Sequence, residues 1–376
     1  MMDTIRKLLN KTGTAIFLSI FLGFSFGALV LALAGYNPIE AYAVLFKGIF
    51  GRPRYMVQTI IAATPIIITG ISVTFAYKTG LFNIGADGQF MVGAVAAACV
   101  GYFVKLPPII HPIAVILAAM AAAGIYGGFV GHLKAKYGIN EVLTSIMLNW
   151  IAIYFNNFYI TLPGVKKPGA EASYEIQQTA YINVLNNLKS TPEGIEKIRE
   201  NPFWADIIIR TDINYGIIIA IICAVAVWFI LEKTTLGYSL KAVGSNKDAA
   251  EFAGINVRKN ITLSMFISGA IAGLAGAVYI MGMMPHRVIV LAMSENYGFN
   301  GLSVALLANL NPIGCIFSGL LFGGLKYGGG SIQTELGAPS EIINIMIGVI
   351  VLFISMNTIF KMISDWTKKR GKFNED

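Results

Sequence analysis

Charged residues are scarce in this chain. Asp, Glu, Lys and Arg make up 13% of its 376 residues, while hydrophobic residues make up 56%. Soluble domains carry about 25% charged residues, and a helix that crosses a bilayer needs about 20 consecutive apolar residues. The chain supplies such apolar runs repeatedly. The composition excludes an ordinary soluble domain and predicts an all-α polytopic membrane protein.

Cysteine and histidine are also few, with three of each. Cys99, Cys223 and Cys315 each lie within an apolar run, and the histidines are scattered without metal-ligand spacing. We therefore expect no disulfide, no metal site and no thiol or imidazole catalysis. The net charge of +8 comes from basic residues spread through the loops, which is typical of the positive-inside rule and not of a nucleic-acid surface.

Nucleotide-binding and catalytic motifs are absent from the sequence. It contains no G-x-x-x-x-G-K-[ST] phosphate loop, no dinucleotide fingerprint and no nucleophile elbow. We therefore expect no enzyme activity and no cofactor of the chain's own. If ATP drives its function, another chain binds that ATP.

The apolar runs predict the membrane spans. Asn309, Asn311 and Pro312 interrupt one stretch, which indicates a discontinuous or re-entrant pair. We expect 8–10 transmembrane helices in a single domain, 1–376, with N-terminal helices over 14–161, an insertion at 162–213 and C-terminal helices over 214–360. The individual runs are 14–34, 56–76, 80–104, 109–133, 139–161, 214–231, 261–283, 299–310, 312–328 and 341–360.

The distribution of charge predicts the orientation. Lysines and arginines gather in alternate loops, in the N-terminal segment and in the TKKRGK sequence near the C-terminus. In the 162–213 insertion, six basic residues are balanced by seven acidic ones. The positive-inside rule then places both termini in the cytoplasm and the insertion outside.

Polar residues at membrane depth mark the first informative segment, GLFNIGADGQF at 80–90. A carboxylate there costs about 2.5–3.5 kcal/mol even on the most lenient scale. Asn83 and Asp87 are four residues apart, so on a helix they would share a face, with Gln89 lying away from them. Two hypotheses remain open: these side chains satisfy broken backbone and cross-helix donors, or they line a solute path. Asn149, in a later run, is a further candidate for the path.

A short echo of this segment occurs late in the chain. GFNGLS at 298–303 begins a run from the opposite side of the membrane to GLFNIG at 80–85. Opposite starting sides are what an inverted repeat produces. Asn300, within the second segment, joins the candidate pathway residues.

Two series of small residues predict close helix packing. Ala119, Ala123, Gly127 and Gly131 recur every four residues, as do Gly269, Gly273 and Ala277. Small residues let membrane helices approach closely. We expect these series to be packing faces and not ligand contacts.

The second informative segment is the loop 232–260. Ser245, with Asp248 three residues later, resembles a capping box, and Gly254 is placed to end a helix. The short helix Lys247–Ala253 between them would expose the apolar residues Ala249, Ala250 and Phe252. Such a surface predicts a docking helix for a cytoplasmic partner.

Three ordered motifs carry a resemblance to a known family. They are GLFNIGADGQ, then TTLGYSLKAVGSNKDAAEFAGI, then GFNGLSVALLANLNPIGCIFSGLLFGGL. They resemble the permease subunits of bacterial ABC importers, in the branch that serves ribose-type sugars, branched-chain amino acids and nucleosides. "NIGADGQ" and the long insertion are most similar to nucleoside or simple-sugar permeases. One departure is Asn309-Leu310-Asn311, where the family often has glycine.

The resemblance implies a transport role and a set of partners. The chain would move a small polar solute, a nucleoside first and a simple sugar next, by alternating access across the bacterial plasma membrane. It would pair with a second, similar permease, receive solute from an extracytoplasmic lipoprotein, and carry two cytoplasmic ATPases. The residues expected to contact the ATPases are Gly237, Ala249, Ala250, Glu251, Phe252 and Gly254. Membrane lipid is an expected partner and nucleic acid is not.

Two other classes of function stay open at this point. An ion-coupled secondary transporter would suit an inverted repeat and a carboxylate at the membrane midplane, but it would not explain the 232–260 loop. A membrane-embedded enzyme lacks paired acids, a metal cluster or a nucleophile with its base. The sequence does not name the solute, since apolar pockets with a few polar groups serve many ligands.

Overall fold

The computed structural model describes residues 12–185, 189 and 191–355. Within these ranges the regular structure is helical, and β-pairing is limited to isolated bridges. The expected all-α class is confirmed. The basic N-terminal residues and the TKKRGK sequence, on which the predicted orientation partly rests, lie outside the described ranges.

The chain forms two compact units, Met1–Arg52 with Leu325–Asp376, and Pro53–Gly324. The first unit contains α2 (Thr12–Leu33), α3 (Pro38–Phe50), the last part of α16 (Gly314–Leu336) and α17 (Ser340–Ser355). Ile20–Leu33 and α3 form a pair bent by 118° that together is apolar enough for one span. α3 was not predicted, because its 13 residues follow a turn and were assigned to a loop.

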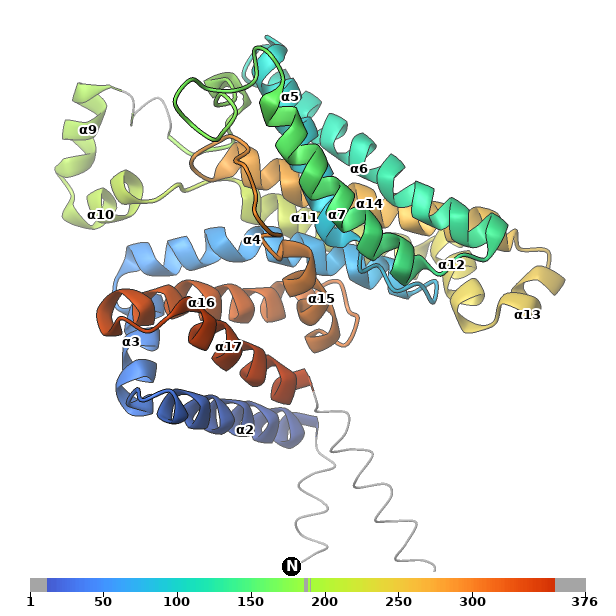
Figure 1. The fold of residues 1–376 in the computed structure, drawn as a ribbon, viewed down its shortest axis with the longest axis horizontal. Helices are drawn as coiled ribbons and strands as arrows, with labels where there is room; N and C mark the ends of the chain where they lie inside the picture. Colours follow the sequence, from blue (N-terminus) through green and yellow to red (C-terminus); the bar gives the residue numbers. More distant parts are fainter. Residues whose placement is uncertain (1–11, 186–188, 190, 356–376) are drawn as a thin grey trace, which may run out of the picture. The chain divides into compact units, whose positions relative to one another are not determined.

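The second unit carries most of the helices (Figure 1). They are α4 (Pro53–Tyr77), α5 (Ala86–Phe103), α6 (Ile110–Tyr137), α7 (Glu141–Thr161), η1 (Gln178–Ala180), α9 (Pro192–Arg199), α10 (Pro202–Arg210), α11 (Gly216–Lys233), α12 (Thr235–Ser245), α13 (Lys247–Phe252), α14 (Val257–Gly282) and α15 (Tyr297–Leu307). The apolar windows of α4 and α14 are 89% and 78% buried, so these two helices form the centre of the unit.

The two predicted packing faces meet each other on α6 and α14. A methyl group at Gly269 would overlap Ala123 O, and one at Gly273 would overlap Ala119 O. At Gly127 it would lie 2.5 Å from Met265 O. The absence of side chains at these positions lets the two backbones approach closely. The prediction of a small-residue packing face is confirmed.

Five of the described helices are long and apolar enough to cross a membrane, namely α4, α5, α6, α11 and α14, and the bent pair in the first unit raises the number to six. The 21-residue α7 is also long, but Asn149, Asn156 and Asn157 make it more polar. The expected count of eight to ten spans stays a prediction, as does the single functional domain.

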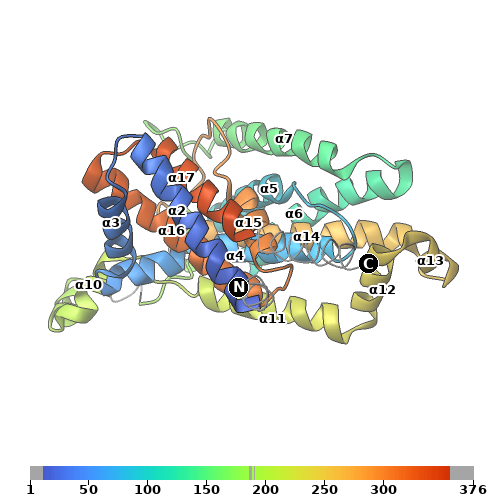
Figure 2. The same ribbon diagram turned by 90° about the horizontal axis from the view of Figure 1, so that it is seen from below.

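The two loop regions singled out in the sequence lie at opposite ends of the second unit. Figure 1 places α12 and α13 at one end and α9 and α10 at the other, and Figure 2 shows α10 and α13 at opposite ends as well. We call these the α13 end and the α10 end. The described part of the insertion 162–213 contains η1, α9 and α10 and belongs to this unit.

Candidate functional site

The segment between α4 and α5 is not helical. α4 ends at Tyr77, Gly80 has a φ of +72°, and α5 begins only at Ala86. Asn83 therefore lies in irregular chain, and the prediction that it shares a helix face with Asp87 is wrong. Gly80, with its positive φ, allows the chain to leave the helical path.

The side chains of Asn83 and Gln89 bind each other in the protein interior. Asn83 Nδ2 donates to Gln89 Oε1 at 2.8 Å, and Gln89 Nε2 donates to Asn83 Oδ1 at 3.2 Å. Asn83 Nδ2 also donates to Ser268 Oγ of α14 at 2.7 Å, and Ser268 Oγ donates to Ser72 O of α4 at 2.8 Å. The expectation that Gln89 lies away from Asn83 is wrong. This network ties the irregular segment to the two central helices.

Asn149 of α7 binds the backbone where α5 begins. Its Oδ1 accepts from Gly88 N at 2.9 Å, and its Nδ2 donates to Ile84 O at 3.1 Å. A helix start leaves backbone groups without intrahelical partners, and lipid offers none. One amide side chain thus satisfies both a donor and an acceptor of the broken backbone.

Asp87 joins the starts of two short helices. Its Oδ1 accepts from Gly298 N at 2.8 Å, in the first turn of α15, and its Oδ2 accepts from Ser294 Oγ. α15's own N-cap residue, Asn296, makes no side-chain cap bond. Asp87 therefore caps α15 from another helix, and it lies in the first turn of α5 as well. Helix N-termini favour a negative charge, so both ends stabilise this carboxylate.

This contact brings the start of α5, directly after segment 80–85, against Gly298 of segment 298–303. A Cβ at Gly298 would overlap the backbone of Asp87, so the two helix starts touch directly. An inverted repeat would bring two such starts together, and it stays a prediction.

The break after α15 confirms the predicted interruption. α15 has 11 residues, Asn309 and Leu310 have φ values of +51° and +56°, and α16 begins at Gly314. α16, at 23 residues, is longer than the expected 312–328 run, so only α15 is a short member of the pair. Both residues adopt the left-handed conformation without being glycine, the residue that adopts it at no steric cost.

The five predicted pathway residues fall into two groups. Asn83, Asp87, Gln89 and Asn149 are at most 6% exposed and hydrogen-bond other parts of the protein. Asn300, on α15, is partly exposed. A role in a solute path stays a prediction for all five. The geometry gives the four buried side chains a structural task that sequence spacing did not show.

Aromatic side chains gather beside this junction, towards the α10 end. The ring of Phe90 lies 4.8 Å from that of Tyr297 and 5.6 Å from that of Tyr279. Tyr279 Oη donates to Glu295 Oε1 at 3.3 Å. Phe90, Tyr279 and Glu295 line a cavity of about 30 Å³, which is room for roughly one water molecule.

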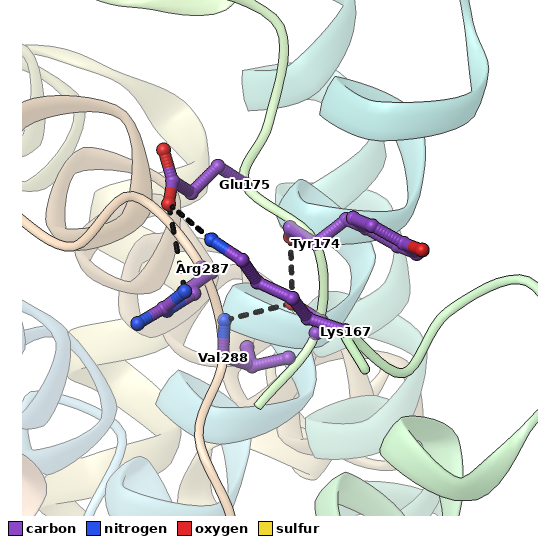
Figure 3. A network of polar contacts seen from close by, with 6 residues as sticks. Lys167, Tyr174, Glu175, Arg287 and Val288 are labelled. Carbon is purple, nitrogen blue, oxygen red and sulfur yellow. Dashed lines mark hydrogen bonds and ion pairs between the residues drawn. The ribbon is translucent and has the colours of Figure 1, made fainter. Parts of the chain in front are cut away.

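A strap from the insertion covers the loop that leads to α15. Ser173 N donates to Val288 O at 2.9 Å and Ile176 N to His286 O at 3.0 Å. Figure 3 shows Glu175 between Lys167 and Arg287, at 3.4 and 3.5 Å. The insertion therefore holds the same loop that carries Ser294, the partner of Asp87.

The α13 end differs in detail from the predicted docking helix. The N-cap of α13 is Asn246, whose Oδ1 accepts from Ala249 N at 3.0 Å, so the predicted capping by Ser245 is wrong. Gly254 ends the helix with a φ of +82°, as expected. Phe252 is 98% exposed, while Ala250 is 4% exposed and packs in the core.

The remaining residues expected to contact ATPases also include both exposed and buried positions. Ala249, Glu251 and Gly254 are exposed. Gly237 is buried at the corner between α11 and α12, where a Cβ would overlap the carbonyl groups of Ile230 and Leu231. The prediction that Ala250 is exposed is wrong, because it is the one alanine of α13 that faces Val243 and Met265 in the core.

The apolar spans, the broken helices and the polar junction between them are those of a multi-pass membrane protein. Residues 55–355 match the family described as the branched-chain amino acid transport system permease component. The chain belongs to this permease family. Its class is a transport subunit, and ABC permeases work with ATP-binding subunits and substrate-binding partners.

Relatives match along nearly the whole chain. A guanosine ABC transporter permease protein of Bacillus subtilis is 38% identical over 94% of this chain and 96% of its own length. A nucleoside ABC transporter permease protein of Lactococcus lactis is 35% identical over 96% and 99%. A glucose ABC transporter permease protein of Haloferax volcanii is 30% identical over 92% and 87%. No solved structure matches the chain.

Sequence reasoning missed several partners in the site. Ser268, Ser294 and Gly298 each bind one of the predicted polar residues. Small hydroxyl residues and glycine are common in membrane helices, so they gave no signal of their own. The GFNGLS echo included Gly298, and it was the nearest available indication.

Proposed function

We propose that this chain is the membrane-spanning subunit of an ATP-driven importer for nucleosides. The observation that carries the proposal is near-full-length similarity to permeases named for guanosine and for nucleosides. A simple sugar is the second candidate, supported by the glucose permease relative. Membership of the permease family argues against the ion-coupled transporter considered from the sequence.

In this proposal the α13 end is cytoplasmic and the α10 end faces outward, with both termini in the cytoplasm. Phe252 is 98% exposed on α13, and together with the exposed Ala249 and Gly254 it offers an apolar surface that supports a docked ATPase there. The ATPases bind the ATP, and this chain needs no cofactor. A substrate-binding lipoprotein delivers solute at the α10 end, and a second permease completes the pathway.

The structure supports Asn300 as the residue of the proposed pathway most accessible to solute. It lies one turn into α15, partly exposed, and no described residue hydrogen-bonds its side-chain amide. A polar side chain at membrane depth is a functional candidate when its surroundings do not explain it. The four buried candidates hydrogen-bond the helix starts and the irregular segment beside α15.

Uptake tests the function directly. The chain would be expressed with its cognate ATPase, second permease and lipoprotein in a host without nucleoside uptake. We expect uptake of radiolabelled guanosine that excess nucleoside suppresses and excess glucose does not. Inactivating the partner ATPase should abolish it. Uptake that survives this inactivation and stops when ion gradients collapse would contradict the proposal.

A pair of variants tests the pathway. Asn300→Ala should change the KM for uptake while leaving the melting temperature in detergent unchanged. Asn149→Ala leaves Gly88 N and Ile84 O without the side chain that binds them. Each unsatisfied group should lower the free energy of unfolding by about 1–3 kcal/mol, so the melting temperature should fall. Normal uptake by Asn300→Ala across a panel of nucleosides would remove Asn300 from the pathway.

A further inference from the structure

A groove opens on the surface between the last turns of α6 and the first turns of α14. Its volume is about 730 Å³, which is within the size range of ligand sites. Ala135, Leu263 and Phe266 form its apolar part, and Phe266 is 37% exposed. Ala135 and Leu263 are partly exposed, so the apolar part of the groove is accessible to a ligand.

The mouth of the groove is basic. Lys136 lies in the last turn of α6, and Arg258 and Lys259 lie in the first turn of α14. All three are exposed and line the groove, and no acidic residue lines it. Among the described residues none of the three forms an ion pair, whereas the neighbouring Lys134 is paired with Glu141 at 2.8 Å. The mouth therefore presents three cationic groups to an anionic ligand.

The apolar part runs into the membrane from this mouth. Phe266 lies eight residues beyond Arg258 on α14, which is about 12 Å along the helix axis. α6 and α14 are both long and apolar enough to span the bilayer, and the groove opens at the end of both spans. Its cations therefore lie at the depth of lipid headgroups and its apolar wall at the depth of acyl chains.

We propose that this groove binds one phospholipid with an anionic headgroup. The phosphate lies beside Lys136, Arg258 and Lys259, and an acyl chain lies along Leu263 and Phe266. An acidic protein segment would match the charges at the mouth but would have to leave its backbone polar groups in hydrocarbon to follow the groove inward. Basic pockets between membrane helices favour anionic headgroups, with about 1 kcal/mol for each cation near the surface.

This site lies next to α13 in the chain. Ile255 and Val257 precede the groove residues of α14 and pack against the cluster that contains Ala250 of α13. A bound lipid would therefore stabilise the first turn of α14, and with it the base of α13. The proposal does not depend on the identity of the transported solute.

The test compares lipids on the purified chain in mild detergent. Phosphatidylglycerol should raise the melting temperature and remain bound in native mass spectrometry, while phosphatidylcholine should do neither. Inorganic phosphate and deacylated glycerophosphoglycerol, which lack acyl chains, should have no effect. Equal effects of phosphatidylglycerol and phosphatidylcholine, or a full effect of the deacylated headgroup, would overturn the proposal.

Two groove variants and one control variant test where the lipid binds. Lys136→Gln with Arg258→Gln and Lys259→Gln should weaken phosphatidylglycerol binding by about fivefold for each cation removed. The matched control, Lys197→Gln with Arg199→Gln and Arg210→Gln in α9 and α10, removes the same charge and should bind normally. Ala135→Trp fills the apolar part without changing charge and should also weaken binding.

Retained lipid preference in the groove variants would refute the site. If these variants instead lose only the ATPase during co-purification while lipid binding is unchanged, the groove binds a protein segment and the proposal fails. If the native assembly takes up no guanosine while the native chain keeps its preference for phosphatidylglycerol, that result would count against the proposed function alone.

Discussion

At the residue scale, the buried polar groups of this protein hold together backbone that is broken within the membrane. Asp87 and Asn149 bind helix starts, and Asn83 binds Ser268 of α14 from the irregular segment. A buried polar group without a partner costs free energy comparable to a lost hydrogen bond, and lipid supplies no substitute. The polar residues that stood out in the sequence therefore stabilise the fold by hydrogen-bonding this broken backbone and the helices beside it.

Asp87→Leu tests that task. The substitution leaves Gly298 N and Ser294 Oγ without their acceptor, and we expect a loss of about 1–3 kcal/mol or more and a lower melting temperature in detergent. Asp87→Asn retains one acceptor oxygen and should lose less. Glu196→Gln, at an exposed position on α9, is the control and should be neutral. An unchanged melting temperature for Asp87→Leu would show that the cap of α15 is dispensable.

His286 gives a pH dependence at the α10 end. Burial lowers the pKa of its imidazole below the usual value, against opposing effects from the Ile280 carbonyl group and the carboxylates of Asp212 and Glu175. The folded state thus binds the proton less well than the unfolded state, so stability is full above about pH 6.5 and falls as the pH drops below it. Its ring also stacks on Tyr181 at 4.0 Å.

Hydrogen exchange of the strap at residues 171–176 measures this effect. Corrected for intrinsic exchange, protection should fall between pH 7.5 and pH 5.5 in the native chain. His286→Gln should make protection nearly independent of pH over that range. Equal pH dependence in both proteins would assign the effect to other groups.

At the element scale, the helices differ in how they use their faces. Some faces carry small residues and pack closely, and others are exposed. α6 and α14 pack through glycine and alanine. α13 has one face of each kind, because Ala250 is buried in the core while Phe252 is exposed. A single helix of six residues is thus anchored on one side and free on the other.

Gly273→Ala tests the packing of α6 and α14. The added methyl group would overlap Ala119 O, and overpacking costs about 1–3 kcal/mol. We expect a lower melting temperature. Gly348→Ala on α17, where no atom lies within 4 Å of the added methyl group, should be neutral or slightly stabilising. Equal behaviour of the two variants would mean that the α6–α14 contact is looser than the structure shows.

Phe252→Asp tests α13 as a docking helix. Because Phe252 makes little contact with the rest of the chain, the melting temperature of the isolated chain should not change. Co-purification of the ATPase and guanosine uptake should both be lost. Ala250→Arg should instead destabilise the chain, since it places a charge in the core. Normal ATPase retention by a folded Phe252→Asp protein would place the docking surface elsewhere.

At the scale of the whole molecule, the second unit carries a different surface at each of its two ends. The α10 end carries the insertion, its strap and the aromatic cluster, and the α13 end carries the exposed Phe252 and the basic groove. The proposed function requires these ends to face opposite sides of the membrane. The loop that carries Ser294 and Asn296 connects the strap to the junction at Asp87.

Single cysteines test this orientation. Glu196→Cys on α9 should react with an impermeant thiol reagent on intact cells, and Ser245→Cys at the end of α12 should react only after the membrane is opened. Both positions are exposed. The parent protein, with its three native cysteines, serves as the background. The reverse labelling pattern would exchange the partners proposed for the two ends.

The sequence by itself determined the class of the protein, the approximate positions of the long helices, the break before Pro312 and the small-residue faces of α6 and α14. These features depend on local composition and on the fixed spacing of residues along a helix, and both can be read from a single segment. The family resemblance, confirmed by the permease match, also came from contiguous motifs.

Only the tertiary structure decided which polar groups meet. Asp87 and Gly298 are 211 residues apart in the chain, and Gly88 and Asn149 are 61 apart. Helical spacing placed Asn83 beside Asp87 and away from Gln89, because it assumed a continuous helix where the backbone is broken. It likewise could not show that Ala250 is buried and Phe252 exposed, since a short helix gains its orientation from the distant elements that it packs against. Contacts between distant segments, and not local spacing, assign these residues their roles.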